Sequence, residues 1–270
     1  MYSGTTLRNA SGNIMGAHQK IDRVARRAFG ELLPEVDFPQ IKQILYFEGL
    51  NGPDGMKRKS PAQDEPWHYY QPGSTDSQPI LEDIQLHYDN LVKQLRSGNT
   101  ERAAFEAAWL AHAITDGLTP AHHYPYEEEL EKLRGESMDT RDSVKDKLLI
   151  SGDTRLQLLA NNWKMWGAKG LMTTHGLFEL GVASIITPMR LKKGYPTTTD
   201  LVKAQQKGLV ALFEDAAQGI YALQMYERYY RLGWTKKLAR EVRQTLVPTM
   251  VKVVALAWCM AAAEARRNAS

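Results

Sequence analysis

Two histidines and an aspartate lie within residues 112–122 at spacings that suit a metal ion. His112 and Asp116 are four positions apart, so on a helix their side chains share one face. Gly117 and Pro120 break that helix and let His122 turn back toward the same point from irregular chain. Two imidazoles and a carboxylate are typical zinc ligands. The segment therefore predicts a metal site.

Other residues of ligand type occur elsewhere in the chain. His175 and Glu179 form a second pair at four-residue spacing, although such a pair also arises as a helix salt bridge. Asp54 lies between glycines, and His68 follows a tryptophan in a proline-rich stretch. His18 falls in the first turn of the first expected helix. The sequence thus offers several more candidate ligands around the central segment.

These motifs together resemble the zinc-dependent phospholipase C family of bacteria and the related single-strand-specific fungal nucleases. The matching segments are HAITDGLTPAH at His112–His122, HGLFE at His175–Glu179, GPDG around Asp54, PWHYY around His68 and AHQKID around His18. The resemblance covers residues 14–185 and implies an all-helical fold with a metal cleft. A long gap between His122 and His175 indicates an insertion at 126–170.

The resemblance also implies two or three zinc ions and their ligands. One ion would be bound by Asp54, His68, His112 and Asp116, a second by His122, His175 and Glu179, and a third by Asp116, as a bridge, and His18. In the family the third ion also binds the amine and carbonyl of an N-terminal tryptophan. This chain begins Met1-Tyr2 and has no tryptophan before His18. We therefore expect the third site to be incomplete or filled differently.

Such a cluster suits the hydrolysis of phosphate esters. Zinc lowers the pKa of bound water to about 7, and two metals about 3.5–4 Å apart can stabilise both the attacking and the leaving oxygen. Asp116 would bridge the metals, and Asp54 would act both as a ligand and as the catalytic general base. No glycine-rich phosphate loop, nucleophile elbow or CxxC pair occurs in the sequence. We therefore predict a phospholipase C-like phosphodiesterase acting on a phospholipid or another phosphate ester.

Two alternatives remain open from the sequence. A nuclease or nucleotidase of the same fold could stack a base on Trp67, Tyr69 or Tyr124. A helical interaction protein without catalysis could carry a structural or vestigial metal site, with the insertion and the C-terminal helices as binding surfaces. Metal ligands alone do not choose between lipid and nucleotide substrates, because both present the same reacting group.

Composition places the chain in a broad class. Its 270 residues are 43% hydrophobic with a net charge of +3, and the basic residues are scattered, so no specific nucleic-acid signal is present. A single cysteine, Cys259, excludes an intrachain disulfide and lies in an apolar run typical of a core. The sequence before the first helix lacks the pattern of a secretory signal, so the chain is expected to be either cytoplasmic or written without its leader, and the resembled family is usually secreted. Transient contact with a membrane surface is expected, without a transmembrane segment.

Helical patterns dominate the chain, and no alternating strand pattern or internal repeat is present. We predict one all-α domain over 1–270, with a long loop from Gly49 to Pro79. Helices are expected at 17–33, at 80–96, from a cap at Thr100 to about Thr115, at 171–186, at 200–232 and at 236–266. The segment 127–159 should be helical in pieces, broken at Gly135 and Gly152, and the last helix should bend at Pro248. Its apolar stretch, 246–263, reads as a buried terminal helix.

Overall fold

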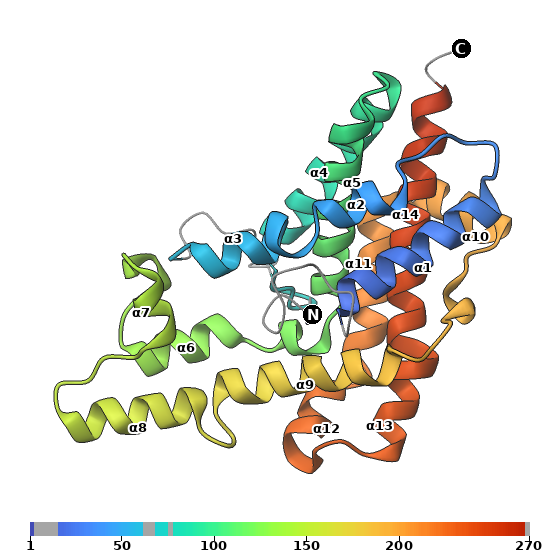
Figure 1. Ribbon diagram of the computed structural model, residues 1–270. Helices are drawn as coiled ribbons and strands as arrows, with labels where there is room; N and C mark the ends of the chain where they lie inside the picture. The colour runs from blue at the N-terminus through green and yellow to red at the C-terminus, as the bar shows by residue number, and fades with distance from the viewer. Residues whose placement is uncertain (3–15, 62–67, 75–77, 268–270) are drawn as a thin grey trace.

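The computed structural model describes residues 1–2, 16–61, 68–74 and 78–267 and is helical throughout those ranges, with no strand in them (Figure 1). The α-helices are α1 Ala17–Leu32, α2 Ile41–Tyr46, α3 Pro53–Lys59, α4 Gln78–Arg96, α5 Thr100–Gly117, α6 Tyr126–Arg134, α7 Val144–Leu148, α8 Arg155–Trp166, α9 Leu171–Ile186, α10 Thr198–Lys207, α11 Leu209–Tyr221, α12 Met225–Leu232, α13 Lys236–Glu241 and α14 Val247–Arg267. The predicted all-α class is confirmed.

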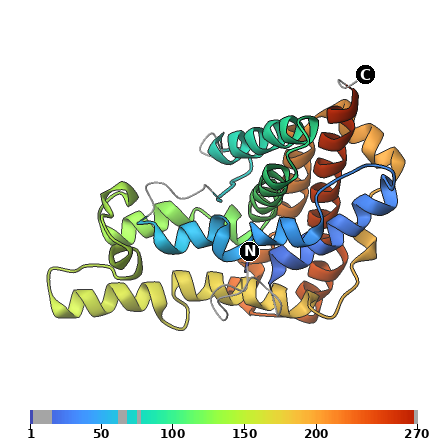
Figure 2. The same ribbon diagram turned by 45° about the horizontal axis from the view of Figure 1, so that its top comes forward.

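Helix α14 forms the centre of the main core. It packs against α1, α4 and α5, and the views of Figures 1 and 2 both show these helices around it. Trp258, fully buried, donates from its indole nitrogen to the carbonyl of Ala107 at 3.0 Å. The stretch Lys236–Arg267 is long and apolar enough to cross a membrane, but 83% of its apolar window is buried inside the protein. That burial is the environment of a core helix, as expected for the terminal segment.

Helix α5 carries the central motif through this core. Its alanines are buried and let α4 and α14 approach closely. The predicted cap at Thr100 is wrong by one position, because the side chain of Asn99 accepts the backbone N–H of Arg102. The helix continues beyond Thr115 to Gly117, so His112 and Asp116 both lie on regular helix. The 3-10 turn Pro120–His123 follows and brings His122 back toward them.

The prediction of a continuous loop from Gly49 to Pro79 is wrong in its first part. A 3-10 turn, Gly49–Asn51, leads into α3, so Asp54 lies in the first turn of a helix. Pro53 supplies the fixed φ that a first helical position favours, and basic residues in the last turn complement the helix dipole. Glycine and proline thus mark the start of a helix here, whereas the sequence predicts a loop.

The long helix predicted over 200–232 is divided into α10, α11 and α12. Gly208 has a φ of 87°, a left-handed conformation that ends α10 and that glycine adopts without strain. Gln224 has a φ of 47° and starts α12 at a new angle. Hydrophobic periodicity continued across both breaks, so the sequence pattern concealed them.

The last predicted helix contains an irregular turn before its proline. A wider π-type turn, Val242–Leu246, joins α13 to α14 and ends two residues before Pro248. Proline lacks the amide hydrogen and its ring collides with the carbonyl four residues back, which favours a widened turn at this place. The irregularity expected at Pro248 therefore precedes it.

Helices α6, α7 and α8 extend to one side of the main bundle, and α9 returns from them along its lower edge (Figure 1). As expected, breaks occur near Gly135, which has a φ of 77°, and Gly152. Tyr126, Leu130, Ile150 and Met165 form a small core separate from the main one. The single domain and the insertion at 126–170 remain predictions, and this small core lies within the predicted insertion.

Replacement of Gly117, at the end of α5, tests how closely the helices pack. A Cβ at this position would lie 2.6 Å from the ring of Phe213 and 3.0 Å from Ile80, both fully buried. We expect Gly117→Ala to destabilise the protein by about 1–3 kcal/mol, because a packed core does not yield space. Thermal or denaturant unfolding measures it.

The matched control is Gly219→Ala in α11, where no atom lies within 4 Å of the added Cβ. It should stabilise by about 0.4–1 kcal/mol, since alanine restricts the unfolded chain and favours helix. Equal stability of the two variants would contradict the packing described.

Candidate metal centre

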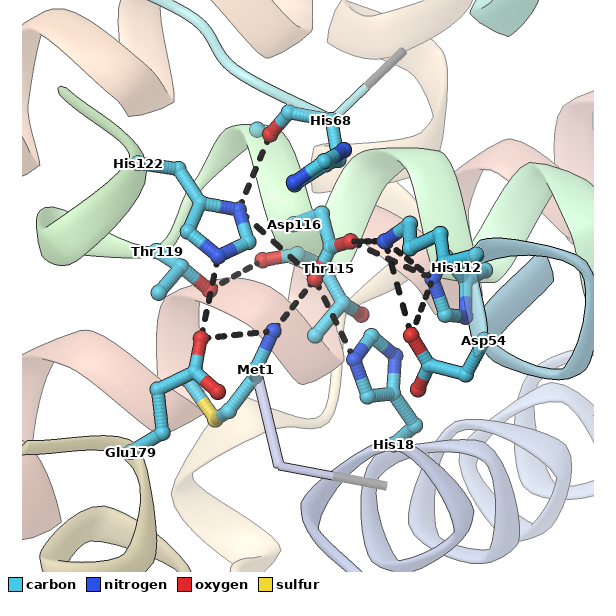
Figure 3. A network of polar contacts seen from close by, with 12 residues as sticks. Met1, His18, Asp54, His68, His112, Thr115, Asp116, Thr119, His122 and Glu179 are labelled. Atoms are coloured by element: carbon cyan, nitrogen blue, oxygen red, sulfur yellow. Dashed lines mark hydrogen bonds and ion pairs between the residues drawn. The ribbon is translucent and has the colours of Figure 1, made fainter. Parts of the chain in front are cut away.

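Asp116 lies at the centre of a buried polar network that joins four distant parts of the chain (Figure 3). One carboxylate oxygen, Oδ1, accepts from the α-amino group of Met1 and lies 3.2 Å from His18 Nε2. The other, Oδ2, lies 2.7 Å from Lys57 Nζ and 3.2 Å from His112 Nε2. Burial by itself would raise the pKa of Asp116, but Lys57, the α-amino group and His112 hold it well below its usual range. The carboxylate is therefore ionised.

Lys57 lies among the predicted ligands of the first zinc ion. Its ammonium is 3.5 Å from Asp54 Oδ1 and 3.3 Å from His112 Nε2, besides its bond to Asp116. Burial by itself would lower the pKa of Lys57, but Asp116 and Asp54 raise it. Burial would also raise the pKa of Asp54, yet Lys57 and His112 bring it to about 2. The Lys57 ammonium thus lies against three of the four predicted donors and compensates the charge of the two carboxylates.

The fourth predicted donor, His68, lies on the opposite side of the network. Its ring packs edge-on against that of His122 at 5.2 Å, and its carbonyl accepts from His122 Nδ1 at 2.9 Å. Among the described residues no close group joins Asp54, His68, His112 and Asp116. In this conformation the first predicted ligand set does not fit a zinc ion, because Lys57 lies within it and His68 outside it.

The second predicted set is brought together as one group. The ligand atoms of His122, His175 and Glu179 lie within 4.8 Å of one another. Glu179 Oε1 is 2.9 Å from His122 Nε2 and 3.2 Å from His175 Nε2. The two histidine rings are stacked with centroids 5.0 Å apart. Helix α9 supplies His175 and Glu179 one turn apart, and the 3-10 turn after α5 supplies His122.

The protonation of His122 favours a cation at this group. Burial, followed by the nearby α-amino group of Met1, lowers the pKa of His122 to about 4. Because Nδ1 donates to the His68 carbonyl, the neutral ring presents the lone pair of Nε2 to a carboxylate oxygen. Two lone pairs directed at one point repel, and a metal ion between them would add to the positive charge of the Met1 α-amino group, which lies 3.3 Å from the same oxygen. A histidine that donates its other N–H to a backbone carbonyl is also the usual arrangement of a metal ligand.

The third predicted set, Asp116 and His18, is joined by the N-terminal residue. The α-amino group of Met1 contacts Asp116 and lies 3.3 Å from Glu179 Oε1. The expectation of a third site that is incomplete or filled differently stays a prediction, and the residue whose α-amino group lies here is methionine and not tryptophan. Burial would lower the pKa of the amine, but Asp116 and Glu179 raise it. In this structure the amine is a charge partner of both carboxylates.

Glu48 is a buried member of the site that the sequence did not reveal. Its Oε1 lies 2.8 Å from His112 Nδ1 and 4.0 Å from His18 Nδ1, so these three form a second candidate ligand group. Burial by itself would lower the pKa of His112, but Glu48 and Asp116 raise it to about 10. Asp22, also buried, has a pKa raised well above its usual range by burial and by the charge of Glu48.

An open cavity of about 410 Å³ gives access to the network. It is lined by Met1, Tyr2, Asp54, Lys57, His68, Asp116, His122, Met172, His175, Gly176, Glu179 and Leu180. The group of His122, His175 and Glu179 lines the same space as Lys57, so a small anionic group could contact both. His112 and Glu48 lie behind this lining and support it.

The two remaining histidines, His87 and His123, have partners outside the predicted ligand sets. His87 Nδ1 lies 2.7 Å from Glu106 Oε2, and His123 Nε2 donates to the carbonyl of Gly117 at 2.8 Å. Burial lowers the pKa of His123 to about 4, so it is neutral.

The residues missed from the sequence differ in how they could have been found. Lys57 follows Asp54 by three positions, and a helix there would have placed both on one face. Glu48 lies outside every motif, and only the packing of the turn after α2 against α5 brings it to His112. Met1 reaches the site through tertiary structure alone.

No protein-family model, no curated protein and no solved structure matches this chain. The functional argument therefore stands on the geometry of the site and on the resemblance of its motifs.

Lys57→Met tests whether the lysine excludes a metal ion. Without metal, the variant should be less stable by about 3 kcal/mol or more, because a largely buried carboxylate loses its partner. In zinc it should bind one more ion per chain than the wild type, since Asp54, His112 and Asp116 become available. Elemental analysis after dialysis and unfolding with a chelator measure the two effects.

Lys59→Met is the control, two residues along α3 and exposed. It should leave both stability and zinc content unchanged. An identical zinc content in all three proteins would show that Lys57 does not compete with metal.

Proposed function

We propose that this protein is a metal-dependent phosphate-ester hydrolase, most simply a phospholipase C-like phosphodiesterase that uses zinc. The observation that carries the proposal is the group of His122, His175 and Glu179 beside an open cavity that also exposes Lys57 and Asp54. A metal site with an accessible face, next to an ammonium group, suits a substrate with a negatively charged phosphate. The all-helical fold and the motif order support the resemblance to the phospholipase C and nuclease family.

His122, His175 and Glu179 would hold the metal, which when bound supplies Lewis acidity and a water that ionises near neutral pH. These residues fix its position because His122 is oriented by the His68 carbonyl and the other two by one helix. Glu179 is ionised: burial would raise its pKa, but the α-amino group and His175 hold it well below its usual range. An ionised carboxylate and a neutral imidazole are the forms that bind a metal.

Lys57 and Asp54 would act on the substrate side of the cavity. The Lys57 ammonium would offset the charge on a phosphate oxygen, a contribution that strengthens as the transition state gains charge. Asp54 is ionised and its pKa of about 2 makes it a weak proton acceptor. We therefore propose that Asp54 orients a water or a metal ligand and does not act as the main proton acceptor. Asp116 holds both sides together, as ligand or as counter-ion.

The nuclease alternative has less support from the residues around the cavity. Trp67 lies outside the described residues, and the ring of Tyr69 packs against those of His122 and Tyr126. Tyr124 lines a different cavity. The third reading, a helical interaction protein with a structural metal, predicts bound zinc without hydrolysis.

His175→Ala tests the proposal. It should lower the zinc content of the purified protein and reduce hydrolysis of bis-p-nitrophenyl phosphate by at least about a hundredfold, because one of three ligands is lost. The helices should remain, since His175 is partly exposed and outside the main core. Zinc analysis, the rate and circular dichroism are measured on one preparation.

His87→Ala serves as the control because His87 pairs with Glu106 away from the cavity. A folded wild type that binds no metal would refute the proposal, and bound zinc without any hydrolysis would favour the structural reading. Parallel assays on phosphatidylcholine vesicles and single-stranded DNA then distinguish phospholipase C activity from nuclease activity.

A further inference from the structure

Helix α8 presents its apolar side to solvent. Leu156, Leu159 and Trp163 are 80%, 64% and 71% exposed. At about 100° per residue these three positions fall within about 60° of one another, and Trp166 lies about 20° beyond them. Met165, the buried residue of α8, is on the opposite side. The apolar face, as the term is used below, consists of the exposed residues Leu148, Leu149, Leu156, Leu159, Trp163 and Trp166.

The polar side of α8 is the one fixed to the protein. Asn162 Nδ2 donates to the carbonyl of Ile150 at 2.7 Å, and the Ile150 N–H donates to Asn162 Oδ1 at 3.2 Å. Asn161 Nδ2 donates to the carbonyl of Ser151 at 2.9 Å. A helix that packs on its core by asparagines and leaves leucines in water is reversed relative to an ordinary surface helix. This orientation indicates a docking surface.

The charge around the apolar face is positive. Residues 144–170 hold five basic side chains and two acidic ones, a net charge of +3. Arg155 and Lys164 lie on either side of the apolar stripe, by the same helical spacing. Lys164 and Lys169 also line, with Lys132 and Glu129, a cavity of about 410 Å³ between α6, α8 and α12. Exposed leucine and tryptophan bordered by lysine and arginine is the pattern of a helix that lies in a membrane interface.

We propose that the apolar face docks on the surface of a phospholipid bilayer that contains anionic lipids. Leucine and tryptophan would enter the boundary between headgroups and acyl chains, while lysine and arginine stems extend to the phosphates. A symmetric contact with a second copy would bring two positive arms together, which charge repulsion opposes. The lipid surface is therefore the favoured occupant.

The docking surface is connected to the candidate metal centre. Four residues separate α8 from α9, which carries His175 and Glu179, and the two helices lie nearly end to end in Figure 1. Met172 in the first turn of α9 lines the metal-centre cavity. Docking thus brings lipid phosphodiesters near the metal, and the assignment of lipid as substrate rests on the proposed function.

Vesicle flotation of the full-length protein tests the docking. The wild type should bind mixed phosphatidylcholine–phosphatidylglycerol vesicles at low salt, and binding should weaken as salt rises. Leu156→Ser combined with Trp163→Ser should lower the partition coefficient at least about tenfold, because the apolar anchor is lost. Tryptophan emission should shift to shorter wavelength with vesicles in the wild type and shift less in Trp163→Phe.

Gln157→Ser combined with Ala168→Ser is the control, since both positions are exposed and lie outside the apolar face. It should bind vesicles as the wild type does. His175→Ala should also bind normally, so failure of docking is distinguishable from failure of the metal centre. Equal partitioning of the Leu156/Trp163 variant, or no partitioning of the wild type, overturns the proposal. A wild-type dimer that this variant converts to monomer would assign the face to a second copy and overturn it too.

Discussion

The structure depends on one buried negative charge, the carboxylate of Asp116. A carboxylate without water is tolerated only where opposite charges and donors surround it. Here they come from the N-terminal residue, from α1, from α3 and from α5 itself. The requirement to compensate one charge therefore fixes where four separate segments meet. The buried alanines of α5 permit that meeting because they let the neighbouring helices pack closely.

The two sides of Asp116 differ in their electrostatics. On the side of Lys57 and His112, carboxylates and cations alternate, and the charges are balanced by the chain alone. On the side of His122 and His175, two imidazole nitrogens and the α-amino group of Met1 approach the same oxygen of Glu179. A sequence reading treats all these residues alike as potential ligands. The three-dimensional structure separates the residues paired with Lys57 from those grouped as candidate metal ligands around Glu179.

The sequence predicted the features that local chemistry controls. The four-residue spacings of the central motif and of α9 place side chains on one helical face regardless of the rest of the fold, and α9 has the predicted bounds. The breaks at Gly208 and Gln224 were missed because periodicity persists across them. Glu48 and Lys57 were missed for another reason. Their contacts with His112 join residues far apart in the chain, and no single helix or motif contains both partners.

The fixing of α8 by its asparagines has a consequence for how such a protein could evolve. Asn161 and Asn162 donate to the main-chain carbonyls of Ser151 and Ile150, and any residue at positions 150 and 151 supplies such a carbonyl. Among the outward side chains, Trp166 donates from its indole nitrogen to the carbonyl of Leu148 at 2.8 Å, whereas Leu156, Leu159 and Trp163 make none of these bonds. Their identity can therefore drift without disturbing the helix or the ligands on α9. The leucines of the outward face can therefore vary while α8 keeps its place beside α9, and natural variation can retarget recognition at the periphery while preserving the ligands in the interior.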